Sequence, residues 1–512
     1  MTNASQQPQT APTLTGKSPL LVGLLLTGLL LLGSILRLYD LDDAPFDFHG
    51  TRQLHNAIIT RGIYYELLPD ADPARKEIAL QHAGSMPQYE PPLFENIVAR
   101  TYFVLGREDF AVPRLFASLF WLVGGLFLFD MARRLTGSDG ALFGLGFYLL
   151  LPFAVQASRS FQPEPLMVML LVISLYCLSR WAQAPAWKWA LPAGMFGGLA
   201  VLTKIVAAYL VGGAAVGIVL AAVGFKAALR SRQVWTMVTL MILPSALYYL
   251  VDRSGSASEY FSNWTLSLAH LLTDPSLYVR WMSFLHSLIG LPMLIAGLIG
   301  VLLAPPRLKA MLLGLWIGYF LYGITLPYQM YTHSYYHLQL IPVIGLSLAP
   351  LAGQVGALLA GQNRFSRLLL AGILLVSAAY PAWVARSTLA AEDFRPEISY
   401  WEEVSAVLPE NEPVIALTQD YGYRLMYYGW RKARLWPTSA EQELARLRGN
   451  QIDILARFQE LTEGRSYFLV TAMEQYRSQG ALRLILEDSY PLLQSGDNYL
   501  IYDLRTPLPA AP

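Results

Sequence analysis

The sequence predicts an α-helical polytopic membrane protein that ends in a small α/β domain. Of its 512 residues, 54% are hydrophobic, and the mean hydropathy is +0.39. A soluble domain could not cover that much apolar surface. Long apolar runs recur as far as Val384, and the hydropathy falls from Glu397 onward. From Ser387 the chain carries 12 Lys/Arg and 18 Asp/Glu, a charge of −6, so the preceding part carries +7. This asymmetry indicates two different kinds of structure.

The apolar runs define eleven candidate transmembrane helices. A bilayer core requires about 20 apolar residues, so the shorter runs need flanking residues to cross. Only helices fit such runs in lipid, because every backbone polar group must be satisfied within the segment. The runs are residues 20–36, 115–131, 141–155, 165–179, 189–202, 205–223, 234–251, 281–303, 311–326, 338–360 and 368–384.

Basic residues in alternate loops predict the orientation of these helices. With a cytoplasmic N-terminus, every inside loop carries Lys or Arg, as the positive-inside rule requires. These residues are Arg133, Arg134, Arg180, Lys188, Lys226, Arg230, Arg232, Arg307, Lys309, Arg364 and Arg367. An odd number of spans then places the C-terminal part outside the cytoplasm. We therefore expect a cytoplasmic disordered tail (1–19), a transmembrane domain (20–386) and an extracytoplasmic α/β domain (387–512). The first run lacks a cleavage site, so we interpret it as a retained anchor.

The first outer loop, residues 37–112, is long enough to have its own structure. Residues 51–68 and 91–105 have apolar residues at helical spacing, and Pro91 and Pro92 suit a helix start. We interpret both segments as amphipathic helices lying on the membrane surface. The loop from Asp252 to Arg280, with Phe261 and Trp264, is a further interfacial segment.

The C-terminal domain combines short strands with helices. Residues 414–417, 467–470 and 499–502 have the composition of strands, and residues 441–448, 452–461 and 475–486 that of helices. It contains no Gly-rich phosphate loop and no Ser/His/Asp pattern. We expect it to act as a lid or as a surface on which the acceptor docks.

Residues 37–61 contain four aspartates and two histidines, although only 14% of the whole chain is charged. Asp47, His49 and Arg52 offer a carboxylate, an imidazole and a guanidinium. These groups can activate a hydroxyl and hold a phosphate. The alternative is a solvated loop whose charges only reflect the charge bias that accompanies membrane topology.

Further polar residues fall at the predicted outer ends of the helices. Ionisable groups near membrane spans are costly, which favours a functional role. Each also has a structural interpretation. Lys204 could extend to the membrane–water interface, and the histidines could lie at that interface. Arg159 could pair with Glu164, and Glu90 could charge the first turn of a helix. The set comprises Glu90, Arg159, Gln162, Glu164, Lys204, His333, Tyr335, Tyr336 and His337.

Several of these residues are potential metal ligands, namely Asp47, His49, His55, Glu90, His333 and His337. Their spacing matches no metal motif such as H-E-x-x-H. We expect no required cofactor, with a divalent metal as the alternative. The single cysteine, Cys177, excludes an intrachain disulfide.

Five motifs, taken in order, resemble the polytopic GT-C glycosyltransferases. They are FDFHGTRQ, EPPLFENIVARTYFVLG with VPRLFASL, SRSFQPEPLM, GGLAVLTK and HSYYHLQLIP. Within that superfamily the chain looks most like the branch of protein O-mannosyltransferases and the aminoarabinose transferase of lipid A. The resemblance covers residues 20–384. No W-W-D motif is present, which argues against the oligosaccharyltransferase branch.

The resemblance implies an enzyme that takes a sugar from a polyprenyl-phosphate carrier and inverts its anomeric centre. By resemblance, Asp47 is the first candidate for the base that accepts the acceptor's proton. Arg52, Lys204 and Arg159, with Tyr336 and His337, are candidates for binding the donor phosphate. Glu90, Glu164, His333 and Tyr335 are candidates for binding substrate.

The sequence departs from the family pattern in two places. Relatives have an acidic pair three residues before the arginine, where this chain has His49-Gly50. Either Asp47 or His49 is therefore the base, and we favour Asp47. The aminoarabinose transferase has a lysine where this chain has Glu90. This difference argues against the same donor sugar.

The sequence thus predicts an inverting glycosyltransferase of a prokaryotic inner membrane. Its partners would be a polyprenyl-phosphate-linked sugar, a lipid, glycan or protein acceptor, and membrane lipids, without nucleic acid. The alternative from another class is a transporter or flippase of lipid-linked sugars, and a third is a scaffold protein. Transporters commonly have internal repeats and helices broken at the midplane, and the sequence contains no repeat.

Overall fold

The computed structural model describes residues 13–16, 18–251, 256–409, 412–450 and 453–509. The predicted tail, residues 1–19, lies mostly outside the described residues. The chain forms two compact units. Unit 1 comprises residues 1–41, 88–94 and 111–392, and unit 2 comprises residues 42–87, 95–110 and 393–512. The sequence-based division placed residues 37–112 with the membrane part, whereas most of them belong to the unit that contains the C-terminal sheet.

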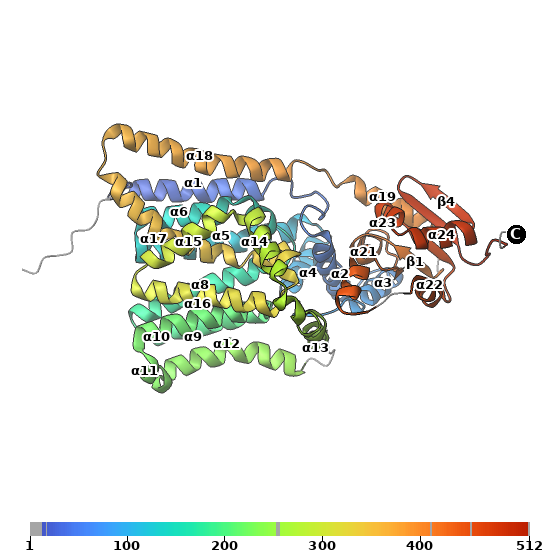
Figure 1. Ribbon diagram of the computed structural model, residues 1–512, viewed down its shortest axis with the longest axis horizontal. Helices are drawn as coiled ribbons and strands as arrows, with labels where there is room; N and C mark the ends of the chain where they lie inside the picture. Colours follow the sequence, from blue (N-terminus) through green and yellow to red (C-terminus); the bar gives the residue numbers. More distant parts are fainter. Residues whose placement is uncertain (1–12, 17, 252–255, 410–411, 451–452, 510–512) are drawn as a thin grey trace, which may run out of the picture. The chain divides into compact units, whose positions relative to one another are not determined.

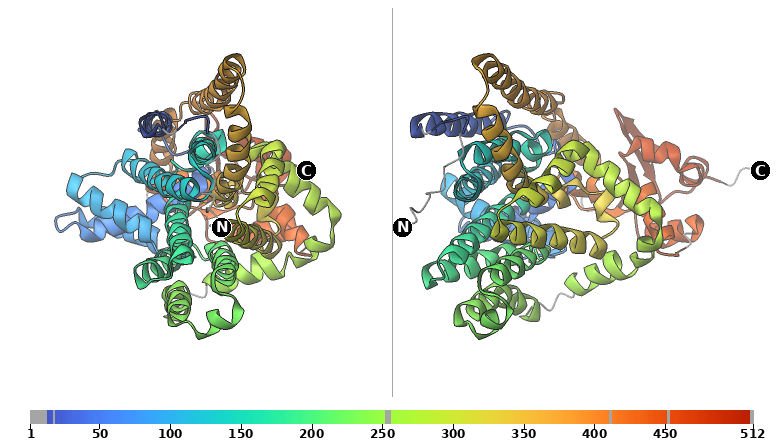
Figure 2. Two further views of the ribbon diagram at one scale, coloured as in Figure 1. Left: turned by 90° about the vertical axis from the view of Figure 1, so that its left-hand side faces the viewer. Right: turned by 60° about the vertical axis from the view of Figure 1, so that its left-hand side comes forward.

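Unit 1 is a bundle of long helices that run roughly along one direction (Figure 1), and several are seen nearly end-on in the left panel of Figure 2. Its helices are α1 (Pro19–Arg37), α5 (Ala111–Thr136), α6 (Ser138–Leu150), α7 (Pro152–Ala157), α8 (Glu164–Gln183), α9 (Trp187–Thr203), α10 (Ala207–Val223), α11 (Phe225–Arg230), α12 (Arg232–Val251), α13 (Ser256–Phe261), α14 (Pro275–Ile289), α15 (Leu291–Leu303), α16 (Pro306–Thr325), α17 (Leu340–Ala360) and α18 (Arg364–Leu389). Single turns at Ser262–Leu266, Ala269–Thr273, Gln329–Tyr331 and Ser334–His337 complete the unit.

Every predicted apolar run is helical, which confirms the polytopic helical fold class. Among the described residues, seven helices are long and apolar enough to cross a membrane, or eight if one bent pair forms a single span. The shorter apolar helices α6 and α10 do not reach that length. The predicted count of eleven spans therefore stays a prediction.

The run from Trp281 to Leu303 was predicted as one candidate span. The structure divides it into α14 and α15, which are bent by 94° at Gly290. Gly290 has φ of 90°, which a glycine adopts without strain. Pro292 then starts the second helix, where its missing N–H costs nothing.

Small residues allow the helices of unit 1 to approach closely. A Cβ added to Gly213 of α10 would lie 2.1 Å from the carbonyl oxygen of Gly314 in α16, and one added to Gly217 would lie 2.1 Å from that of Ala310. Helix pairs in membranes associate through such small-residue contacts, because lipid provides no hydrophobic driving force between helices. The α10–α16 pair therefore depends on glycine at these positions.

Unit 2 joins helices of the first outer loop to the C-terminal domain. Its helices are α2 (Gly50–Leu67), α3 (Pro73–Gly84), residues 95–105 of α4 (Leu93–Leu105), α19 (Pro396–Val407), α20 (Tyr423–Tyr427), α21 (Ser439–Leu447), α22 (Ile454–Thr462), α23 (Met473–Ser478) and α24 (Gly480–Ser489). Its strands are β1 (Val414–Leu417), β2 (Arg434–Leu435), β3 (Tyr467–Val470), β4 (Leu492–Gly496) and β5 (Tyr499–Asp503).

The strands form one mixed sheet in the order β2-β1-β3-β5-β4. Strand β1 pairs in parallel with β2 and β3, while β5 pairs antiparallel with β3 and β4. All residues of β1 and β3 are buried. Two separate apolar clusters, one containing Ile415 and Phe468 and the other Ala416 and Leu469, therefore cover the two faces. The predicted α/β character of the C-terminal region is confirmed.

The local predictions in unit 2 were correct in part. The helices predicted at residues 51–68 and 91–105 exist, but α2 is buried on all sides from Gln53 to Gly62, against α3 and α20. A surface-lying amphipathic helix was therefore the wrong interpretation of α2. Helix α3 and strands β2 and β4 were missed, and the helix predicted at residues 475–486 breaks into α23 and α24 at Gln479.

Candidate functional site

A buried ion pair between Lys204 and Glu164 is the centre of the polar site in unit 1. Lys204 follows α9 in an extended conformation (φ −156°, ψ 118°), and its ammonium donates to Oε1 of Glu164. Both side chains are at most 4% exposed. Glu164 is in the first turn of α8, where the helix dipole favours a carboxylate. No hydrogen-bond partner for the second oxygen, Oε2, is present among the described residues.

Tyrosines surround this ammonium. Nζ of Lys204 lies 5.0 Å from the ring centre of Tyr335 and 4.7 Å from that of Tyr336. Aromatic faces attract a cation most strongly where water is excluded. The hydroxyl of Tyr260 lies 2.5 Å from that of Tyr336, and the ring of His333 packs against both Tyr335 and Tyr336. The structure thus brings together five of the predicted residues, namely Glu164, Lys204, His333, Tyr335 and Tyr336.

Two other predicted residues of unit 1 have different surroundings. His337 is fully buried, and its Nε2 lies 3.1 Å from the carbonyl oxygen of Met330. Because that oxygen can only accept, Nε2 carries the proton, and Nδ1 accepts from the hydroxyl of Tyr319 at 2.6 Å. Both ring nitrogens therefore have hydrogen-bond partners within the protein. Arg159 is buried and donates to the carbonyl oxygen of Asp40, in the turn after α1, at 2.8 Å.

The predicted base region is in unit 2, immediately before α2. His49 precedes the helix in the left-handed conformation (φ 48°, ψ 63°), which is rare for a residue with a side chain. Gln53 is fully buried, and its Nε2 lies 3.2 Å from Oδ1 of Asp47 and 2.9 Å from the carbonyl oxygen of Phe48. Asp47, His49 and Arg52 are each half-buried. The loop therefore presents a half-buried carboxylate and a half-buried imidazole next to the buried side chain of Gln53.

Glu90 is half-buried in unit 1, next to Tyr89, whose ring packs against that of Tyr260. Among the residues that the structure describes, no three His, Cys, Asp or Glu side chains come together as a group that could hold a metal ion.

Sequence reasoning missed three residues that complete these groups. Tyr260 lies in the loop interpreted only as interfacial, and its hydroxyl meets that of Tyr336. Tyr322, within α16, is fully buried, and its ring stacks on that of Tyr336 with 6.1 Å between centroids. Gln53 falls inside the motif FDFHGTRQ, directly after Arg52.

Comparison with known proteins extends these observations. A family model described as dolichyl-phosphate-mannose-protein mannosyltransferase matches residues 89–249. No curated protein gives a significant match to the sequence.

Several solved structures have a similar fold over nearly the whole chain. ArnT from Cupriavidus metallidurans, in the apo state, is 15% identical with a TM-score of 0.56, covering 93% of this chain and 97% of that one. The same protein bound to undecaprenyl phosphate is 16% identical, with a TM-score of 0.55, and covers 94% and 97%. The Archaeoglobus fulgidus oligosaccharyltransferase in complex with Zn and sulfate is 12% identical with a TM-score of 0.58, covering 94% and 73%.

These matches define a multi-span membrane protein with the GT-C fold. The predicted resemblance is confirmed, since the family model and the similar structures all belong to GT-C glycosyltransferases. Within that superfamily, the family model that matches the chain is the one for protein mannosyltransferases, over residues 89–249.

Proposed function

We propose that this protein is an inverting glycosyltransferase that moves a sugar from a polyprenyl-phosphate donor to an acceptor hydroxyl on the extracytoplasmic side of a prokaryotic inner membrane. The acceptor would be a lipid, a glycan or a protein. The observation that carries the proposal is the ammonium of Lys204, which is buried among aromatic rings in a protein of the GT-C fold. The undecaprenyl phosphate bound by ArnT supports a donor of this class.

In this reaction Lys204 would bind the donor phosphate. Negative charge grows on the phosphate as the bond between its oxygen and the anomeric carbon breaks, and a cation held in a water-poor site stabilises that charge strongly. The hydroxyls of Tyr260 and Tyr336 would donate further hydrogen bonds to the phosphate oxygens. Arg52 would contribute a second cation from the loop that holds the base.

Asp47 would accept the proton of the acceptor hydroxyl as the new bond from that oxygen to the anomeric carbon forms. Attack on the face opposite the phosphate inverts the anomeric centre, and polyprenyl phosphate leaves with the electron pair of the broken bond. His49 is the alternative base. Its strained backbone is of a kind that concentrates at functional sites.

Separate Asp47→Asn and His49→Ala variants, assayed with a radiolabelled polyprenyl-phosphate sugar, test these roles. We expect Asp47→Asn to lose transfer by roughly 10²–10⁴-fold, the usual contribution of a general base. Loss in the His49 variant alone would make His49 the base, and full activity in both would contradict either assignment. A flippase would instead move label across vesicles without forming a glycoside.

A further inference from the structure

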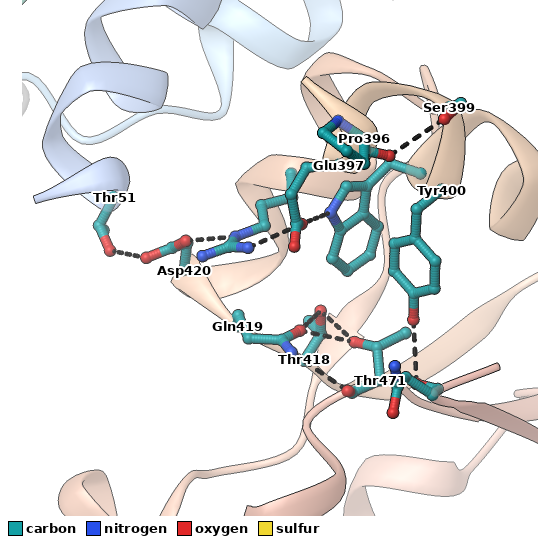
Figure 3. Close-up of polar contacts among 12 residues, drawn as sticks. Thr51, Pro396, Glu397, Ser399, Tyr400, Thr418, Gln419, Asp420 and Thr471 are labelled. Carbon is teal, nitrogen blue, oxygen red and sulfur yellow. Dashed lines mark hydrogen bonds and ion pairs between the residues drawn. The ribbon is translucent and has the colours of Figure 1, made fainter. Parts of the chain in front are cut away.

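The loop of residues 42–52, which carries Asp47 and His49, is held by the C-terminal domain within unit 2. Thr51, in the first turn of α2, donates from Oγ1 to Oδ1 of Asp420 at 2.5 Å (Figure 3). The other oxygen of Asp420 accepts from Nε of Arg424 at 2.6 Å. Arg424 in turn donates to Glu397, 2.9 Å away. A chain of charged hydrogen bonds thus runs from the start of α2 into α19.

Apolar and backbone contacts reinforce this chain. The guanidinium of Arg424 lies over the ring of Phe46 at 4.1 Å, and that ring meets Phe394 edge-on at 5.9 Å. Oδ1 of the buried Asp43 accepts from the backbone N–H of Phe394 at 2.9 Å. A Cβ on Gly50 would lie 2.9 Å from Phe46 and 3.4 Å from Oδ2 of Asp420, so glycine permits the close approach.

Strained backbone occurs on both sides of the Thr51–Asp420 hydrogen bond. His49 has φ of 48° on one side, and Asp420 and Tyr421 have φ of 49° and 54° on the other. Such conformations are costly and persist only where the surroundings enforce them. The contacts between the loop and the C-terminal domain are of the kind that can enforce them.

From this arrangement we propose that Asp420 and Arg424 are positioning residues: through Thr51 they fix the conformation of the loop that presents Asp47 and His49. This inference rests on the proposed function of those two residues. It gives the C-terminal domain a part in catalysis that differs from a lid or a docking surface. Asp420 and Arg424 touch no substrate themselves and act through the loop.

The test compares Thr51→Val, which keeps the shape of the side chain but removes the donor, with Thr51→Ser, which keeps the hydroxyl. Asp420→Asn removes the charge at the other end. The matched controls in the same domain are Thr462→Val, whose hydroxyl bonds only within α22, and Arg505→Gln, which breaks an ion pair with Asp503.

The first readout is amide hydrogen exchange of the full-length protein in detergent, which does not depend on activity. The N–H groups of Arg52 and Gln53 donate to the carbonyl oxygen of His49, so their exchange reports the conformation of that residue. We expect roughly tenfold faster exchange in Thr51→Val and Asp420→Asn, as the loss of a hydrogen bond to a charged group predicts. Thr51→Ser and both controls should exchange like the wild type. Unchanged exchange in the two test variants would overturn the proposal.

The second readout is transfer from a radiolabelled polyprenyl-phosphate sugar. We expect kcat to fall roughly tenfold to a hundredfold in Thr51→Val and Asp420→Asn. KM for the donor should change less than kcat, because Lys204, which also binds the donor phosphate, lies outside the loop. Thr51→Ser should restore kcat. Faster exchange with a wild-type kcat would also overturn the positioning role. If the wild type forms no glycoside at all, the proposed function fails, while the exchange data still decide whether the C-terminal domain fixes the loop.

Discussion

The Lys204–Glu164 pair gives the sharpest prediction, because replacing both residues should restore part of the lost stability without restoring transfer. In Lys204→Met, Oε1 of Glu164 loses the ammonium that donates to it, and Oε2 has no partner among the described residues. Breaking a buried ion pair by removing one partner costs about 3–5 kcal/mol, because the other charge stays buried and unpaired. Replacing both charges removes that penalty. The double variant Lys204→Met/Glu164→Gln should therefore regain about half of the lost stability and stay about 1–3 kcal/mol below the wild type, the cost of an unsatisfied amide.

The assay is the apparent melting temperature of the wild type, both single variants and the double variant in one detergent, together with their transfer rates. We expect Lys204→Met to have the lowest melting temperature, and the double variant to recover. Transfer should stay lost in both variants without Lys204, because the donor phosphate then loses its buried cation. Recovery of transfer together with stability in the double variant would refute the role of Lys204. A melting temperature of Lys204→Met equal to that of the wild type would refute the energetic argument.

Three further predictions concern stability. Burial lowers the pKa of His55 from 6.5 to about 4, so the unfolded state binds a proton that the folded state rejects between these pH values. His55 should therefore remove about 3 kcal/mol of stability as the pH falls from 6.5 to 4. The melting temperature of His55→Gln should depend less on pH across that range. The same pH dependence in the variant and the wild type would contradict this. Arg61 lies over the rings of Tyr427 and Trp430 at 3.7 and 4.2 Å and pairs with Glu108. Arg61→Lys should lower the melting temperature measurably, because an ammonium cannot reproduce the planar stack and paired bonds, and an unchanged value would exclude the stack as a stabilising contact. Gly314→Val should separate α10 from α16 and reduce the yield of folded protein in detergent, whereas Gly372→Val, where a Cβ meets nothing within 4 Å, should not.

The sequence could predict those elements whose secondary structure is determined by their local composition and surroundings. An apolar run in lipid must be helical, and the β-branched and aromatic runs around Val414, Tyr467 and Tyr499 became strands β1, β3 and β5. The clustering of Glu164, Lys204, Tyr335 and Tyr336 was anticipated because costly polar groups stood at the same predicted ends of the spans. The bend at Gly290 was not, since neither the apolar composition nor the length of that run reveals where a helix turns.

Long-range contacts within unit 2 could not be predicted. Residues 42–87 belong with the C-terminal domain because Thr51 meets Asp420 and Arg61 meets Tyr427, contacts between positions more than 360 residues apart. No periodicity in the sequence encodes such pairs. The same reason explains why α2 was interpreted as a surface helix, although its polar residues are buried against α3 and α20.

The most direct test of the central claim is the stereochemistry of the product. The purified protein in lipid vesicles would be given polyprenyl-phosphate sugars of known anomeric configuration, with lipid, glycan and peptide acceptors, and the linkage formed would be read by nuclear magnetic resonance. The proposed inverting mechanism predicts a glycoside whose anomeric configuration is opposite to that of the donor, formed by the wild type and not by Asp47→Asn. A product with the donor's configuration, or an equal yield from Asp47→Asn, would contradict it.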